Sequence, residues 1–86
     1  MGEDMNELIN IGCTSYISID KLVAVVAPDA APIRRMILSA KNMGKLIDAT
    51  CGRKTKSVLC MDSDHIILSC LSVEAIETKV KDCVGG

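Results

Sequence analysis

The stretch LVAVVAPDAAPIRRMILSAKNMG, residues 22–44, contains a strand, a break and a helix in that order. Residues 22–26 are continuously apolar and rich in β-branched side chains, which is typical of a strand covered on both faces. Pro28 ends this strand, and Asp29 is the expected N-cap of the helix. Pro32 then falls in the first helical turn, where proline is tolerated because its missing N–H would have no partner there.

The expected helix is amphipathic. Its apolar side chains recur at helical spacing and are predicted to face a sheet: Ile33, Met36, Ile37, Ala40 and Met43. Gly44 is the expected stop, because glycine readily adopts the left-handed backbone conformation that ends many helices.

Short apolar segments on either side complete an α+β fold. They are interpreted as strands at 8–12, 16–20, 46–50, 56–61 and 65–70, with a final helix at 73–82 that Ser72 caps. Gly52 within the connection 51–54 indicates a hairpin that pairs the strand 46–50 with the strand 56–61. Asp62, Ser63 and Asp64 form a second tight turn. The sequence thus predicts a small, mostly antiparallel sheet with two helices.

The chain length allows one small domain. Its 86 residues are divided into a mobile acidic arm at 1–7, a single domain at 8–83 and a flexible tail at 84–86. The acidic amino terminus lacks the layout of a signal peptide, and no apolar run approaches the length of a membrane span. These features predict a cytoplasmic protein with no membrane partner.

The composition predicts self-association. Apolar residues make up 49% of the chain, yet Tyr16 is its sole aromatic residue. A domain this small gains little stability from its own core. So apolar a short chain is expected to leave hydrophobic surface uncovered, and such surface marks a subunit interface. We therefore expect a homo-oligomer.

The five cysteines are scattered, with no Cys-x-x-Cys pair: Cys13, Cys51, Cys60, Cys70 and Cys83. Free thiols in a reducing cytoplasm are expected rather than a disulfide framework. Cys51 lies near Arg53, which favours a reactive thiol, but no resolving cysteine is adjacent in the sequence. A thiol switch is therefore not expected. Cys60 and Cys70 fall in apolar strands and are interpreted as small core residues.

Positive charge is concentrated in the middle of the chain. Residues 34–56 contain seven basic residues and one acidic residue, Asp48, for a net charge of +6. Because the whole chain carries −1, the remaining residues sum to −7. A local cluster of Lys and Arg can neutralise phosphates whatever the bulk charge, so this polarity indicates a polyanionic partner.

The tip at 52–54, together with Lys56, is the strongest candidate for phosphate binding. A turn between strands projects Arg53 and Lys54 beyond a sheet, where they can reach a nucleic-acid backbone. An ordinary solvated turn is the alternative. Arg34 and Arg35 lie near a helix start, where the helix dipole disfavours cations. They are assigned either to DNA or to an ion pair across a subunit interface.

No constellation for catalysis, a metal or a cofactor accompanies this charge. The string DSDH at 62–65 sets carboxylates beside the lone histidine but lacks a nucleophile and an oxyanion site. Zinc would need more ligands, so no metal is expected there. No small-molecule ligand is evident from the sequence. Aromatic residues for base stacking are also missing, which favours duplex DNA over single strands.

Five segments resemble the RemA family of bacterial extracellular-matrix (biofilm) regulators. They are INIG at 9–12, AVVAP at 24–28, APIRR at 31–35, LIDATCGRKT at 46–55 and MDSDH at 61–65, and the resemblance covers about residues 9–78. It implies a DNA-binding transcriptional activator with a fold related to the LytTR DNA-binding domain. It also implies closed rings with DNA wrapped around the rim, and DNA contacts at Lys21, Arg53 and Lys54.

Two hypotheses follow from the residues and the resemblance. In the first, the protein is not an enzyme but a nucleoid-associated activator of extracellular-matrix genes. Its ring would bind duplex DNA multivalently through Lys21, Arg53, Lys54 and Lys56. In the second, it is a self-assembling scaffold or interaction protein whose basic patch pairs with the acidic surface of the next subunit. The charge polarity suits both.

Overall fold

The computed structural model describes residues 7–84, so residues 1–6 of the expected arm and residues 85–86 of the expected tail lie outside it. In chain order its elements are β1 (Leu8–Asn10), β2 (Tyr16–Ser18), the 3-10 helix η1 (Ile19–Lys21), β3 (Leu22–Val26), α1 (Ala31–Asn42), β4 (Leu46–Asp48), β5 (Ser57–Met61), β6 (Ile66–Ser69) and α2 (Val73–Val84). The α+β class with two helices and mostly antiparallel strands is confirmed.

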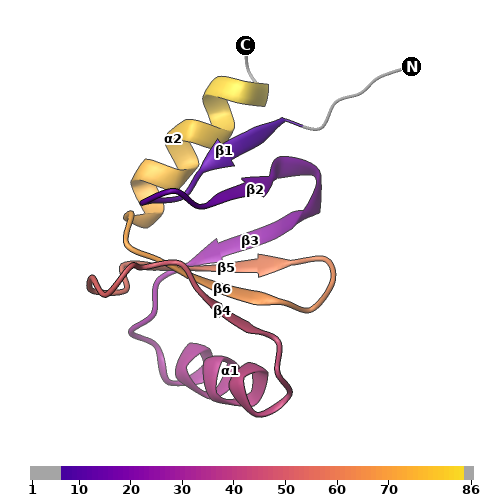
Figure 1. The fold of residues 1–86 in the computed structure, drawn as a ribbon, viewed down its shortest axis with the longest axis vertical. Coiled ribbons are helices and arrows are strands. Elements are labelled where there is room, and N and C mark those ends of the chain that lie inside the picture. The colour runs from indigo at the N-terminus through magenta and orange to yellow at the C-terminus, as the bar shows by residue number, and fades with distance from the viewer. Residues whose placement is uncertain (1–6, 85–86) are drawn as a thin grey trace.

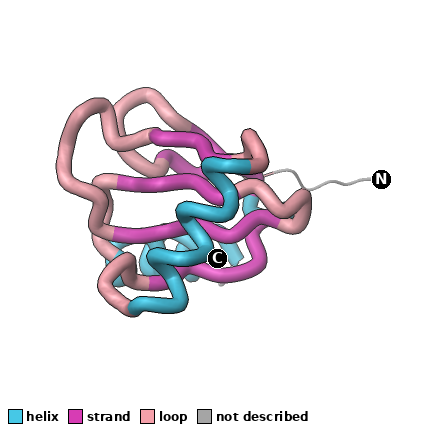
Figure 2. Tube along the Cα trace, turned by 90° about the horizontal axis from the view of Figure 1, so that it is seen from below, coloured by secondary structure: helices cyan, strands magenta, loops and turns pink. Residues whose placement is uncertain are grey.

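The elements are stacked in layers. Figure 1 shows the sheet of β3, β4, β5 and β6 in the middle, with α1 on one side and α2 on the other beside the small sheet of β1 and β2. Figure 2 gives the view along this stack, in which one helix crosses in front of the strands. Each face of the central sheet is therefore covered by a helix.

The strand order corrects the predicted hairpin. The central sheet has the order β3-β5-β6-β4, so β4 does not pair with β5. It pairs with β6 in parallel, Leu46 opposite Ile66, while β5 and β6 form the antiparallel hairpin. The turn 62–65 joins β5 to β6 tightly, whereas the connection 49–56 is long enough to pass over β6. Gly52 therefore belongs to a crossover loop rather than to a hairpin turn.

β3 also departs from the prediction of a strand covered on both faces. It lies at the edge of the sheet, and none of its residues is buried. Its pairing with β5 shifts register between Leu22 and Ala24, which makes Val23 the extra residue of a β-bulge. Val23 is 68% exposed as a result. The preceding strand ends earlier than expected, since residues 19–21 form η1.

α1 begins one residue later than an N-cap at Asp29 would place it. Its N-cap is Ala30, which offers no side-chain hydrogen bond, so the prediction that Asp29 caps the helix is wrong. Pro32 is in the first turn, as expected. Met43 is the C-cap and is 65% exposed, so it is not part of the buried side of the helix. Gly44 follows with φ of +72°, which confirms the predicted stop.

The core is divided by the central sheet. Alternate residues of β5 point to opposite faces: Val58 packs with Ala40 and Ile66 under α1, and Leu59 packs with Ile67 and Ile76 under α2. Ser72 Oγ accepts a hydrogen bond from Ala75 N at 3.1 Å and caps α2, as predicted. Neither helix of the described range is long and apolar enough to span a bilayer.

Candidate nucleic-acid interface

The β4–β5 loop, residues 49–56, is held to β6 at both of its ends. Ala49 N donates to Leu68 O at 2.9 Å, and Lys56 N donates to Ser69 O at 2.8 Å. The loop therefore leaves and rejoins the sheet beside the carboxyl end of β6. In Figure 1 it projects from the end of the sheet opposite the β5–β6 turn.

Asp48 and Thr50 form a compact corner at the start of this loop. Asp48 Oδ1 accepts hydrogen bonds from Thr50 Oγ1 at 2.6 Å and from Thr50 N at 2.9 Å. The side-chain bond first, and then the backbone bond, lower the pKa of Asp48, while desolvation opposes them. The single acid of the basic segment 34–56 is therefore engaged by Thr50 and not by a cation.

Arg53 and Lys54 lie on the exposed side of the next turn. Arg53 N donates to Thr50 O at 3.0 Å, and Cys51 and Gly52 adopt φ values of +55° and +81° to reverse the chain. The side chains of Arg53, Lys54 and Lys56 are all exposed. Within residues 7–84 the one ion pair joins Lys81 Nζ to Glu77 Oε2 at 3.4 Å, on α2 and not in this loop. No acid within that range neutralises the loop.

The structure separates Lys21 from these residues. Lys21 ends η1, and its carbonyl accepts from Asp62 N at 2.8 Å, at the β5–β6 turn. The β4–β5 loop joins β5 at its other end. β5 has five residues, so the two sites are about 17 Å apart along the strand. One copy of the chain therefore presents two separate cationic sites rather than one cluster.

Arg34 and Arg35 are exposed on α1, the helix that covers the other face of the sheet from α2. No acid among residues 7–84 forms an ion pair with either guanidinium. They are not gathered with the β4–β5 loop by any contact that the structure shows. Their assignment to DNA or to a subunit interface stays a prediction.

A disulfide between Cys13 and Cys51 corrects the prediction that all the cysteines are free. The two residues are 38 positions apart in sequence, and their Cα atoms are 6.6 Å apart. Cys13 lies in the β1–β2 turn, residues 11–15. This turn meets the loop because Ser69 Oγ of β6 donates to the Ile11 carbonyl in the interior. Ser69 thus holds the β1–β2 turn through its side chain and Lys56 through its carbonyl.

A sequence signal for this pair existed. Cys13 follows Gly12, the expected end of a strand, and Cys51 begins the expected turn 51–54, whereas Cys60 and Cys70 lie in apolar strands. The lack of a cysteine close to Cys51 in the sequence does not exclude a disulfide, because the fold brings Cys13 to it from 38 positions away. Cys60, Cys70 and Cys83 are free and partly covered, and desolvation raises the pKa of the Cys60 thiol.

The string DSDH is a turn, as predicted. Asp64 N donates to Met61 O at 3.1 Å, and Met61 N donates to His65 O at 3.0 Å. Ser63 Oγ and His65 Nδ1 are hydrogen-bonded at 2.8 Å. No three potential metal ligands gather anywhere in residues 7–84. Every one of these contacts is local to the connection between β5 and β6.

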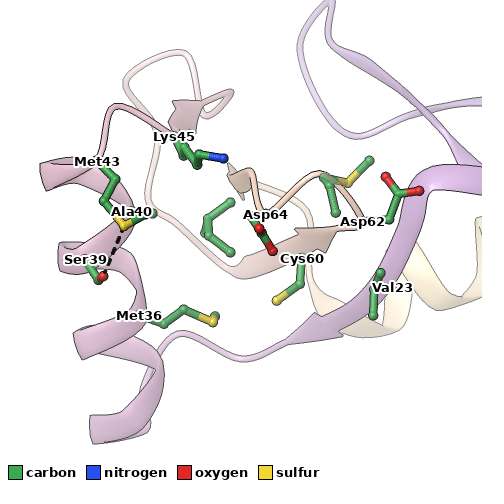
Figure 3. A pocket seen from close by; sticks show the side chains of 11 residues that line it. Val23, Met36, Ser39, Ala40, Met43, Lys45, Cys60, Asp62 and Asp64 are labelled. Atoms are coloured by element: carbon green, nitrogen blue, oxygen red, sulfur yellow. Dashed lines mark hydrogen bonds between the residues drawn. The ribbon is translucent and has the colours of Figure 1, made fainter.

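An apolar hollow of about 580 Å³ lies between α1 and the edge of the sheet. Figure 3 shows Met36 and Ala40 of α1 and its C-cap Met43 on one side of it and Val23 and Cys60 of the strands on the other. Ser39 Oγ contacts Met43 Sδ at 3.8 Å. With both Val23 and Met43 about two-thirds exposed, this hollow is the centre of an uncovered hydrophobic surface.

Comparison with known proteins gives the family. The family model described as RemA-like, extracellular matrix regulatory protein A-like, matches residues 8–80. The chain belongs to the RemA-like family. It is 51% identical over 70 residues to extracellular matrix regulatory protein A of Bacillus subtilis, covering 81% of this chain and 79% of that one. The resemblance read from the five sequence segments is thereby confirmed.

Other RemA-like relatives extend the match. A protein of Thermoanaerobacter sp., named for an inferred regulatory role, is 53% identical over 74 residues, which are 86% of this chain and 77% of the relative. A Synechococcus elongatus protein with the same kind of name is 46% identical over 78 residues, or 91% and 90% of the two chains. These names describe regulators rather than enzymes, and a regulatory role for this chain follows.

Proposed function

We propose that this RemA-like protein regulates transcription by binding duplex DNA through Arg53 and Lys54, with Lys56 and Lys21 as further phosphate contacts. The observation that carries the proposal is the β4–β5 loop. Backbone hydrogen bonds fix both of its ends, and its cations are exposed with no acidic partner in residues 7–84. A rigid base with free cationic side chains suits a phosphate backbone.

The name of the Bacillus subtilis relative supports a finer proposal, in which the protein activates extracellular-matrix genes. Such a protein would act in the cytoplasm, on the nucleoid. One subunit presents few phosphate contacts, so a lone domain would bind DNA weakly. A closed ring would repeat the loop and Lys21 once per subunit, and the bound duplex would contact several subunits at high effective concentration.

The test is the double substitution Arg53→Ala with Lys54→Ala. Because both side chains are exposed, the variant should keep its fold and its oligomeric state. Its affinity for a duplex long enough to span several subunits should fall by about 100-fold or more. Fluorescence anisotropy at several salt concentrations measures this loss, and the slope of log affinity against log salt should become shallower.

The matched control is Lys79→Ala with Lys81→Ala on α2. It changes the net charge by the same amount but away from the β4–β5 loop, so DNA affinity should change little. Equal losses in both variants would show that only total charge matters and would overturn the assignment of Arg53 and Lys54. A tip variant that dissociates into subunits would instead support the scaffold function, in which the basic residues hold neighbouring subunits.

A further inference from the structure

Two turns that are far apart in the sequence meet at the end of the sheet that carries Arg53 and Lys54. The β1–β2 turn supplies Cys13 and the β4–β5 loop supplies Cys51, and the two sulfurs are bonded. Both cysteines are exposed, so an external thiol can reach them. This disulfide lies two residues before Arg53 in the proposed DNA-binding loop. The DNA-binding proposal does not require it.

Cys13 belongs to the more rigid partner. Asn10 Oδ1 accepts from Gly12 N at 3.0 Å, and Asn10 Nδ2 donates to Cys13 O at 3.2 Å. Ser15 N donates to Gly12 O at 3.0 Å and closes the turn. With Ile11 also bonded to Ser69 of β6, the turn is fixed whether or not the disulfide is present.

Cys51 belongs to the less restrained partner. The ends of the β4–β5 loop are anchored at Ala49 and Lys56, and Thr50 is bonded to Asp48, but the hydrogen bond that holds residues 51–55 to the rest of the described chain is Arg53 N to Thr50 O. The disulfide is the second restraint on residues 51–55. Its loss would leave Arg53 and Lys54 on a segment held by a single turn bond, which is free to sample more conformations.

We propose that Cys13–Cys51 is a reversible redox modification site that locks the β4–β5 loop when oxidised. Its consequence rests on the proposed function: the locked loop binds duplex DNA more tightly than the open one. A loop that is ordered before binding loses less conformational entropy on contact with DNA. In a reducing cytoplasm the pair is open, and oxidising conditions close it, as for redox-sensing disulfides of the cytosol.

The chemistry is thiol–disulfide exchange. A thiolate of an external dithiol attacks one sulfur of the pair, so the S–S bond breaks and a mixed disulfide forms. The second thiol of the reductant attacks that mixed disulfide and releases the remaining cysteine. Two electrons pass to the protein, the dithiol leaves as a disulfide, and its two protons end on Cys13 and Cys51. A small-molecule disulfide is the two-electron oxidant of the reverse step.

The first experiment follows the thiols of the full chain. The protein is equilibrated in glutathione buffers of increasing oxidised fraction, alkylated with N-ethylmaleimide and read by mass spectrometry. As the oxidised fraction rises, Cys13 and Cys51 should lose alkylation together. When the protein is unfolded for alkylation, Cys60, Cys70 and Cys83 should be modified in every buffer. Amide hydrogen exchange of residues 51–55 should be faster in the reduced state. Pairing with another cysteine, or unchanged exchange, would overturn the site.

The second experiment measures affinity for duplex DNA in both states. Reduction should weaken binding by about fivefold, the scale of ordering one or two side chains. Cys13→Ser with Cys51→Ser should bind like the reduced protein and ignore the buffer, whereas Cys60→Ser should keep the full response. Equal DNA affinities of the oxidised and reduced proteins would overturn the switch. The DNA-binding function is tested separately by Arg53→Ala with Lys54→Ala. If neither the oxidised nor the reduced protein binds DNA, the proposed DNA-binding function is wrong. The thiol titration and hydrogen exchange then decide whether Cys13–Cys51 is a redox site.

Discussion

Gly12 shows at the residue scale why the β1–β2 turn takes its shape. Its φ is +117°, and a Cβ at this position would lie 2.7 Å from Cys70 Sγ. We expect Gly12→Ala to lower the free energy of unfolding by about 2–3 kcal/mol, because both the backbone and the contact are strained. Urea unfolding followed by circular dichroism measures the loss.

Gly44 provides the control for this prediction. It has φ of +72° but open space around the position of a Cβ. Gly44→Ala should therefore lower the free energy of unfolding by about 1–2 kcal/mol, the cost of placing alanine in the left-handed backbone conformation. If the two substitutions cost the same, the close approach to Cys70 contributes nothing.

Asp48 supplies a prediction about pH. Its pKa is lowered chiefly by the hydrogen bond from Thr50 Oγ1. Since the folded pKa is below the unfolded value of about 4, this contact stabilises the fold above that pH and is lost as pH falls through the folded pKa. Thr50→Val removes the hydroxyl but keeps the shape and the backbone donor. An NMR titration of the Asp48 carboxyl should give a higher pKa in the variant, still below the ordinary value. An unchanged pKa would contradict the role of Thr50 Oγ1.

At the scale of elements, local patterns predicted what each segment is but not what it pairs with. The helical spacing from Ile33 to Ala40 and the stop at Gly44 are local, and the structure has both. Whether β4 pairs with β5 depends on whether β6 lies between them in the sheet, as it does here. Ile66 and Ile67 of β6 are both buried there, but the string HIILSC is no more apolar than LVAVV. Strand order therefore could not be read from composition.

In the candidate site too, some residues could be predicted from the local sequence and others depend on the fold. The basic cluster and the expected turn at 51–54 together predict Arg53 and Lys54, and the structure leaves them exposed on an anchored loop. Lys21 came from the family resemblance, since nothing in its local sequence distinguishes a phosphate contact from a solvated lysine. The Cys13–Cys51 pair was missed because the bond joins two loops that only the packing of β1 against β6 brings together.

At the scale of the whole molecule, the hydrophobic surface around Val23 is the main feature that a single subunit leaves unexplained. Val23 is 68% exposed on a bulged edge strand, and Met43, the C-cap of α1, is 65% exposed on the other side of the same hollow. Bulges commonly blunt an edge against further strand pairing, so we expect side-chain packing rather than an extended sheet between subunits. The ring and the relation to LytTR domains stay predictions.

We predict that the protein self-associates and that Val23→Glu makes it monomeric. The side chain is exposed in the subunit, so the substitution should leave its circular dichroism unchanged, while a buried charge at an interface is strongly unfavourable. Sedimentation velocity measures the oligomeric state, and Thr78→Glu, at an exposed position of α2, is the charge-matched control that should stay assembled. Because a monomer engages DNA through one loop only, Val23→Glu should also weaken duplex binding despite an intact Arg53 and Lys54. An assembled Val23→Glu protein would place the interface elsewhere, and monomers with undiminished affinity would show that one subunit suffices for DNA.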